Sequence, residues 1–284
     1  MTQEPFKLNR QANVLYGNHG EHGDILIGLP GARHLFQRTG AKITICVNKK
    51  FHRIAPFLRD IEFIDGVYIS DSYDQFPSPV DINYLTAIGF DHVCNPMQGH
   101  TRFDWYNYLH YTEENALTHG VLDVKDLFQF DRKIELKRFW GKQDVAAKTI
   151  AFSPYANGKD RAICREDAQF IVDFLKKNGF TVLMLGLEKD LEGVEYLKDN
   201  SLLNAGIQLA ESAGVVTVDT VWSWLAGGYA KPTFGLYSKN YPDMVKQWSH
   251  FPPNPNAVYI VSPDIKTLDR AIIESSLTDW IKTL

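Results

Sequence analysis

The residues best placed for chemistry in this chain are Asp219 and Thr220, which directly follow a β-branched run. A segment of small residues after them predicts a helix, and Pro232 then introduces a second β-rich run. Both residues would therefore lie at the carboxyl end of a strand and at a helix N-terminus, where open α/β sheets bind ligands. The helix dipole and its first N–H groups favour a phosphate there. The predicted ligand-binding residues at this corner are Asp219, Thr220, Ser223 and Trp224.

The sequence leaves open the role of Asp219 and which of two tryptophans lies beside the ligand. Asp219 could cap the helix rather than face a ligand, and both roles can hold together. Trp222 and Trp224 are two residues apart and cannot share one helix face, so we expect one indole in the core and the other beside the ligand.

A second group of candidates lies in the turn after another predicted strand, residues 149–153. Gly158 allows the backbone to approach a ligand closely. Cations follow it, and an arginine can bind two phosphate oxygens at once. Basic loop residues are usually only solvated, and the pattern of a P-loop is absent. This turn adds Ser153, Asn157, Lys159 and Arg161 to the predicted ligand-binding residues, with Lys159 and Arg161 as the cations for a phosphate.

One carboxylate, Asp24, stands in the loop predicted after the first strand. Spacing alone supports two roles equally: a cap for the following helix, or a general base facing the opposite domain. His19 and His22 flank the same loop and are alternative bases, because histidine titrates near neutral pH. No further ligands at a usual spacing accompany them, so a metal site is not expected.

The hydrophobic pattern predicts two series of alternating strands and helices, and hence an α/β fold with two parallel sheets covered on both faces. The first series has strands at 13–17, 42–47, 66–70 and 90–94, and helices at 30–38 and 104–119. The second has strands at 149–153, 180–186, 215–219, 233–237 and 257–262, and helices at 166–177 and from 264. We place an N-terminal domain at 1–140 and a C-terminal domain at 149–284, whose last helix could pack back on the first.

The composition is that of an ordinary globular protein, with 44% hydrophobic and 23% charged residues and a net charge of −4. A global basic field for nucleic acid is absent. Between Arg33 and Arg59, however, there are seven basic residues and no acid, a run that more often forms solvated faces than an anion-binding surface. Three scattered cysteines, no signal peptide and no membrane-spanning run favour a cytoplasmic protein without integral membrane association.

These segments together resemble the heptosyltransferase-like glycosyltransferases of family 9. The segment from Gly23 to Pro30 is similar to the opening of that family, whose Gly-Asp-Val-Leu segment carries the catalytic Asp. The stretch from Ser153 resembles the family's phosphate-binding turn, and the block from Val218 resembles its Asp-Thr/Ser-Gly block. The matches follow the family's order and span most of the chain. Val221 and Trp224 stand where the family has a Gly and a His.

The resemblance implies a GT-B fold, in which two Rossmann-like domains face each other across a cleft. It also implies a metal-independent, inverting transfer of a sugar from a nucleotide diphosphate donor to a hydroxyl of a lipopolysaccharide-type glycan. Asp24 would take the proton of the acceptor hydroxyl, and no cofactor is expected besides the nucleotide-sugar substrate. The acceptor-side residues would be His19, His22 and Arg33.

Two alternatives remain from the sequence. A phage-type DNA glycosyltransferase would act on a hydroxylated base and use the run from Arg33 to Arg59 to bind nucleic-acid phosphates. A non-catalytic protein would bind a nucleotide-sugar at the same corner without transfer.

Overall fold

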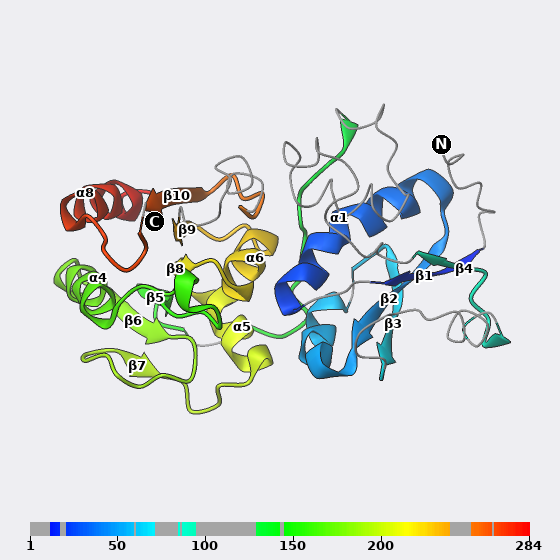
Figure 1. The fold of residues 1–284 in the computed structure, drawn as a ribbon, viewed down its shortest axis with the longest axis horizontal. Coiled ribbons are helices and arrows are strands. Elements are labelled where there is room, and N and C mark those ends of the chain that lie inside the picture. Colours follow the sequence, from blue (N-terminus) through cyan, green and yellow to red (C-terminus); the bar gives the residue numbers. More distant parts are fainter. Residues whose placement is uncertain are drawn as a thin grey trace. The chain divides into compact units, whose positions relative to one another are not determined.

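The computed structural model describes residues 12–17, 21–59, 61–71, 85, 87–94, 129–142, 145–238, 251–262 and 264–284. They form two compact units, here called the N-terminal unit, which ends at Phe139, and the C-terminal unit, which begins at Trp140. Each unit is built on its own parallel sheet (Figure 1). The predicted α/β class with two parallel sheets is therefore confirmed. The predicted helix over 104–119 and the candidate His19 lie outside the described residues.

The sheet of the N-terminal unit has the strand order β3-β2-β1-β4. Its strands are parallel throughout. They are β1 (Asn13–Gly17), β2 (Lys42–Asn48), β3 (Ile64–Ser70) and β4 (His92–Cys94). Between them lie the helix α1 (His22–Thr39), which joins β1 to β2, and the 3-10 helix η1 (Lys49–Leu58), which joins β2 to β3. In central β1, Val14, Leu15 and Tyr16 are completely buried, as expected of a parallel strand covered on both faces.

Helix α1 begins at His22 and not at Pro30, so the prediction of its start was wrong. Glu21 is the N-cap, and its N–H donates to Asp24 Oδ2 at 2.7 Å. Pro30 lies inside the helix, where it cannot donate to the carbonyl of Leu26. The helix continues through this missing bond because apolar side chains are buried on both sides of it. They are Ile25, Leu26, Leu29, Ala32 and Leu35.

The sheet of the C-terminal unit has the order β10-β9-β8-β5-β6-β7. Its strands are β5 (Thr149–Ser153), β6 (Thr181–Met184), β7 (Glu195–Tyr196), β8 (Gly214–Val218), β9 (Thr233–Ser238) and β10 (Ala257–Ser262). Its helices are η4 (Lys159–Arg161), α4 (Arg165–Lys177), α5 (Leu202–Glu211), α6 (Val221–Gly228) and α8 (Arg270–Ile281). From β5 the chain builds outward through β6 to β7, then returns to place β8 on the other side of β5. The strand order therefore reverses between β5 and β8.

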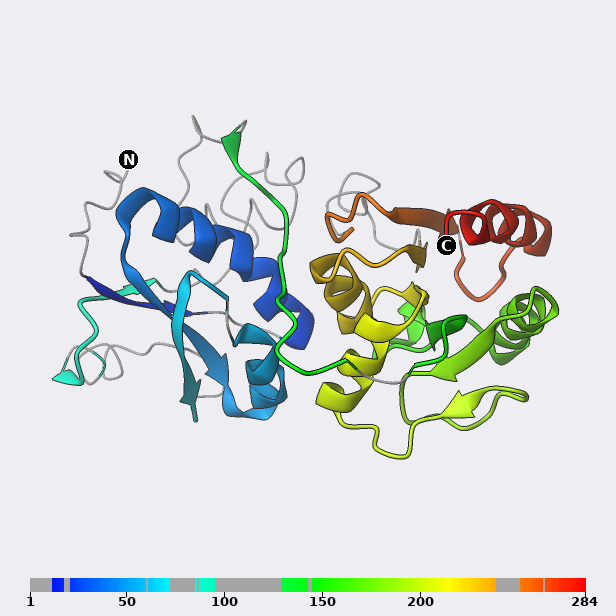
Figure 2. The same cartoon turned by 180° about the vertical axis from the view of Figure 1, so that it is seen from behind.

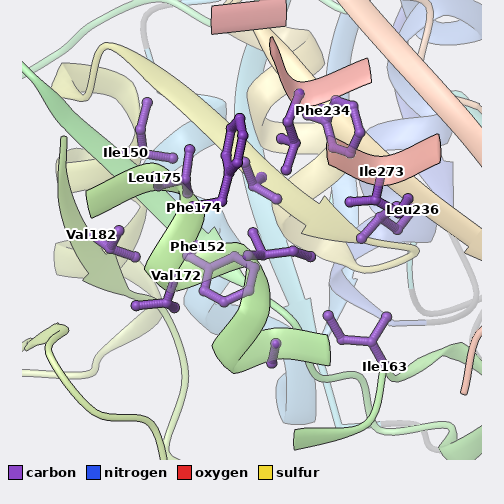
Figure 3. Packing of buried hydrophobic residues seen from close by; sticks show 14 of the residues in the cluster. Ile150, Phe152, Ile163, Val172, Phe174, Leu175, Val182, Phe234, Leu236 and Ile273 are labelled. Atoms are coloured by element: carbon purple, nitrogen blue, oxygen red, sulfur yellow. The ribbon is translucent and has the colours of Figure 1, made fainter. Parts of the chain in front are cut away.

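Helices cover both faces of this sheet: α4 and α8 lie on one side, and α5 and α6 on the other (Figures 1 and 2). Figure 3 shows the core beneath α4 and α8, where Phe152 of β5 packs with Leu175 of α4 and Ile273 of α8. These side chains are at most 2% exposed. The main apolar core of the C-terminal unit thus joins α4 and α8 over one face of the sheet.

Helix α8 starts at Arg270, later than the predicted start at 264. Asp269 fixes that start, because its carboxylate accepts from the N–H groups of Ala271 and Ile272. Ile273, Leu277 and Trp280 of α8 are buried in the core of the C-terminal unit. The helix therefore packs on its own sheet, and a further contact of its end with the first domain stays a prediction.

Candidate functional site

The reversal of strand order between β5 and β8 is the place where an open α/β sheet forms a ligand site, at the carboxyl ends of its strands. Ser153, 1% exposed, ends β5 and pairs in register with Thr217 of β8. Asp219 and Thr220 follow β8 directly. The end of β5 and the residues after β8, which are far apart in the sequence, therefore meet at one place, called here the β5/β8 edge.

Thr220, and not Asp219, is the N-cap of α6. Its Oγ1 accepts from the N–H of Trp222 at 3.2 Å and lies 3.3 Å from the hydroxyl of Thr217. Ser223 is completely buried, and its hydroxyl donates to the Thr220 carbonyl at 2.7 Å. Both hydroxyls are thus engaged in shaping the helix start, and α6 points the positive end of its dipole towards the β5/β8 edge.

Because Thr220 serves as the cap, Asp219 is available for a different contact. Its Oδ2 lies 3.6 Å from Nη1 of Arg161, which comes from η4 in the β5–α4 connection. The side chain of Asp219 is 12% exposed and that of Arg161 30% exposed. Gly158 makes room for this arginine, since a Cβ at Gly158 would lie 3.0 Å from Arg161 Nε. The guanidinium of Arg161 therefore approaches Gly158 closely, and the approach of a ligand to this glycine stays a prediction.

A second contact fixes the loop that carries Arg161. Tyr155, just after β5, donates to Asp190 Oδ2 at 2.8 Å. Arg165 Nε donates to the Asp190 carbonyl at 2.8 Å. Burial and the Asp190 carboxylate raise the pKa of Tyr155, so the phenol stays protonated and keeps donating at neutral pH. The loop after β5 is thereby tied to the loop after β6, which holds Arg161 in place.

The remaining predicted residues of this site have different positions. Asn157 is exposed in the same loop, and Lys159 begins η4. Trp224 is only 4% exposed, and its position beside a ligand stays a prediction. Trp222 is the half-buried member of the pair. The choice between the two indoles depends on the direction in which α6 leaves the strand, which spacing alone does not fix.

One residue at this edge was missed by the sequence reasoning. Tyr237 is the penultimate residue of β9, the strand next to β8, and is 4% exposed. Its pKa is raised well above the usual value by burial, then by the nearby Asp219 carboxylate. A tyrosine near the carboxyl end of a predicted strand, beside the predicted corner, was the available signal.

In the N-terminal unit, His22 and Asp24 both lie in the first turn of α1. The hydrogen bond from the Glu21 N–H supports the capping role for Asp24. The ring of His22 meets that of Phe51 edge to face, with centroids 5.2 Å apart. Burial lowers the pKa of His22, with smaller downward effects from Arg53 and His52 and an upward effect from Glu21.

Arg33, predicted to face the acceptor, lies inside the N-terminal unit instead. Its side chain is 10% exposed, and Nη2 lies 2.8 Å from Asp131 Oδ2. The same nitrogen donates to the Asp131 carbonyl at 3.0 Å, and Nη1 lies 3.6 Å from Glu135. Arg33 therefore ties α1 to the extended segment that follows residue 129, which corrects the expectation of an exposed anion-binding group.

The basic run from Arg33 to Arg59 is not one surface. Lys42 begins β2 and Lys49 follows its end, so about 20 Å of strand separates them. Lys49 also pairs with Asp71 at 2.8 Å. The interpretation as solvated faces accounts for the exposed members of the run, and burial accounts for Arg33.

Among the described residues, no three His, Cys, Asp or Glu side chains are grouped so that they could hold a metal ion. A separate feature concerns membranes: in the part of the chain that the structure describes, no helix has the length and hydropathy to cross one.

No protein-family model and no curated protein matches the chain. Solved structures do match it. One is the ADP-heptose lps heptosyltransferase II of E. coli, with a TM-score of 0.71, 14% identity and coverage of 95% of this chain and 99% of that one. Another is a glycosyl transferase of family 9 from Veillonella parvula DSM 2008, with a TM-score of 0.69, 13% identity and coverage of 95% and 90%. The E. coli heptosyltransferase WaaC, solved with ADP, has a TM-score of 0.65, 14% identity and coverage of 94% and 99%.

At this level of identity the match establishes the fold. The chain has the GT-B fold of the family-9 glycosyltransferases, with the similarity extending over nearly its whole length. The resemblance that the three sequence segments indicated is thereby confirmed at the level of the fold.

Proposed function

We propose that the chain is a glycosyltransferase that takes its sugar from a nucleoside diphosphate donor and transfers it to an acceptor hydroxyl. The observation that carries this proposal is the meeting of Arg161, Asp219 and the start of α6 at the β5/β8 edge. The similar structures add weight, because two are named heptosyltransferases and one of these was solved with ADP. A nucleotide-sugar donor and three free cysteines also fit a cytoplasmic location.

In the proposed reaction the donor phosphates lie at the β5/β8 edge. As the bond from the sugar to the diphosphate breaks, negative charge grows on the phosphate oxygens. Arg161 and the dipole of α6 would stabilise that charge, with Lys159 as a further cation in the same turn. These groups would replace a divalent metal, so transfer is expected to continue in the presence of EDTA.

Asp24 is the proposed base. Its carboxylate is held by the Glu21 N–H at 2.7 Å, which gives it the fixed orientation that proton abstraction requires. Attack of the deprotonated acceptor hydroxyl on the anomeric carbon, opposite to the leaving diphosphate, inverts that carbon. The configuration of the product, read by NMR, tests this step.

The proposed acceptor is a hydroxyl of a lipopolysaccharide-type glycan. A DNA acceptor is less well supported, because the basic run is divided between the two ends of β2 and Arg33 is buried. Acceptor binding at several salt concentrations separates the two. A steep fall in affinity with salt indicates a polyanion, whereas a neutral sugar hydroxyl gives a shallow dependence.

The deciding experiment incubates the protein with a panel of nucleotide-sugars and follows release of nucleoside diphosphate by mass spectrometry. Release with one donor, increased by a glycan acceptor, supports the proposal. Binding of a nucleotide-sugar without any release or transfer would identify the non-catalytic alternative.

A further inference from the structure

Tyr237 provides an observation that the proposed function leaves unused. Strand β9 is buried along its whole length, and the Tyr237 side chain packs in an aromatic cluster with Phe251 and Tyr259. Its ring centroid lies 4.6 Å from that of Phe251 and 5.5 Å from that of Tyr259, edge to face in both cases. The ring is thus fixed by its neighbours, and with it the direction of the hydroxyl.

The Tyr237 hydroxyl is buried, and among the described residues it has no hydrogen-bond partner. Ser223 lies nearby and lowers the pKa of Tyr237. Its hydroxyl donates its proton to the Thr220 carbonyl at 2.7 Å, and no hydrogen bond joins it to the Tyr237 hydroxyl.

Val218 of β8 pairs in register with Leu236 of β9, so Asp219 and Tyr237 are the next residues on two neighbouring strands. The Asp219 carboxylate accordingly raises the pKa of Tyr237, and Arg161 lowers it. Leaving a buried hydroxyl unpaired costs stability, and such a group calls for an explanation, of which a partner that binds from outside the protein is one.

The neighbouring tyrosine shows the contrast. Tyr259 belongs to the same aromatic cluster, and its hydroxyl donates to the Pro252 carbonyl at 2.9 Å. Burial raises the pKa of both phenols, so each remains a hydrogen-bond donor at neutral pH. The hydroxyl of Tyr259 is satisfied within the protein, whereas that of Tyr237 has no hydrogen-bond partner among the described residues.

We propose that the Tyr237 hydroxyl donates a hydrogen bond to a phosphate oxygen of the nucleoside diphosphate group bound at the β5/β8 edge. This inference rests on the proposed function, because it needs a phosphorylated ligand at that edge. It adds a neutral donor from β9 to the cation from η4 and the dipole of α6. The phosphate group would then be contacted from three elements of the C-terminal unit.

The test compares Tyr237→Phe with Tyr259→Phe in the full-length protein. Binding of ADP, GDP, CDP, UDP and inorganic pyrophosphate is measured by calorimetry, and unfolding temperatures are recorded without ligand. Tyr237→Phe is expected to weaken the best nucleoside diphosphate and pyrophosphate by about tenfold or more, since the lost bond goes to a charged oxygen. Its unfolding temperature stays equal or rises, because the buried donor is gone. Tyr259→Phe lowers the unfolding temperature and keeps the affinity within about twofold.

The outcomes distinguish a failure of the Tyr237 inference from a failure of the proposed glycosyltransferase function. If the native protein binds a nucleoside diphosphate and Tyr237→Phe binds it equally well, the inference is overturned and the proposed function stands. Equal weakening in both variants overturns it too, because it would show an effect of the aromatic cluster rather than of the hydroxyl. Weaker nucleotide binding with unchanged pyrophosphate binding excludes a phosphate contact. Failure of the native protein to bind any probe rejects the proposed function and the inference together.

Discussion

The two regions that carry the candidate residues are organised in opposite ways. At the β5/β8 edge, residues from β5, η4 and the start of α6 meet because parallel strands end at the same side of a sheet. In the N-terminal unit the described candidates, His22, Asp24 and Arg33, all lie on the single helix α1. Nine residues of helix place Arg33 about 14 Å along the axis from Asp24. The sheet topology brings residues of separate elements together at the β5/β8 edge, whereas helix α1 places its candidates at different positions along its axis.

The regions also differ in whether the residue that caps the helix is the one proposed for the chemistry. At the β5/β8 edge Thr220 caps α6, which leaves Asp219 to pair with Arg161. At the start of α1 the capping bond is made by Asp24 itself, the residue proposed as the base. Substitutions there affect folding and chemistry together unless they are chosen to separate the two.

Asp24→Asn is the sharpest way to separate them, and we expect it to have the largest effect. The amide oxygen of Asn can still accept from the Glu21 N–H, so helix α1 keeps its bond. A neutral amide cannot take a proton, and kcat should fall by roughly 10²–10⁴-fold with unchanged donor affinity. Single-turnover kinetics and calorimetry with the best donor measure these two quantities.

Asp24→Ala is the companion variant, and it should additionally lose about 1 kcal/mol of stability because the capping bond is gone. An Asp24→Asn protein with native kcat would leave Asp24 as a cap only and would remove the N-terminal unit's base from the mechanism.

Arg161→Gln tests the other region. Removing the cation that faces the leaving diphosphate should reduce kcat by about 10²–10³-fold, a typical loss for one electrostatic contact in a transition state. Steady-state kinetics at saturating donor provide the measurement. Arg165→Gln is the matched control, because Arg165 donates to the Asp190 carbonyl and is exposed. Equal losses in both variants would show that loop position, and not the charge of Arg161, is what matters.

Much of the fold was predictable from the sequence because its central strands are short, apolar and β-branched. Strands β5 and β8 are buried at every position, and each matches its predicted segment to within one residue. Helix α4 was also predicted, since Asn178 and a left-handed Gly179 with φ of +82° end it. Helix α5 was missed: Gly206 weakens its pattern, although Ser201 accepts from the Asn204 N–H as an N-cap. The sequence therefore predicted an element correctly where its apolar pattern and the residues that end it indicated the same boundaries.

The site was less predictable, for two physical reasons. Proline prefers the first turn of a helix, so Pro30 indicates a helix start there. Helix α1 nevertheless continues on both sides of Pro30, because the apolar residues before and after it are buried. The pairing of Arg161 with Asp219 depends on the return of the chain to the other side of β5, which spacing cannot show. Tyr237 was missed because the polar side chain near the end of β9 becomes relevant only through the pairing of β9 with β8.

Arg33→Met tests whether Arg33 of the N-terminal unit contributes to stability and not to acceptor binding. The guanidinium is almost buried and bonded to the Asp131 carbonyl, whereas the Asp131 side chain is 61% exposed and returns to water when its partner is lost. We expect a loss of about 1–3 kcal/mol, chiefly from the hydrogen bonds and packing, and no change in acceptor KM. Urea denaturation measures the first quantity.

Arg53→Met is the control for Arg33, because Arg53 is exposed and its loss should change stability by less than about 0.5 kcal/mol. A stable Arg33→Met protein with a raised acceptor KM would restore Arg33 to the acceptor side.

The smallest effect concerns His22 and the pH dependence of the N-terminal unit. Burial lowers the pKa of His22 in the folded state, so the unfolded chain binds the proton more readily. As pH falls through about 6.5, the ordinary value for histidine, the unfolded state gains protons first and the folded state loses relative stability. His22→Gln removes this titration, and its stability measured from pH 8 to pH 5 should decline less than that of the native protein. Parallel curves would mean that the imidazole titrates alike in both states, and that the start of α1 is more open to water than its contact with Phe51 implies.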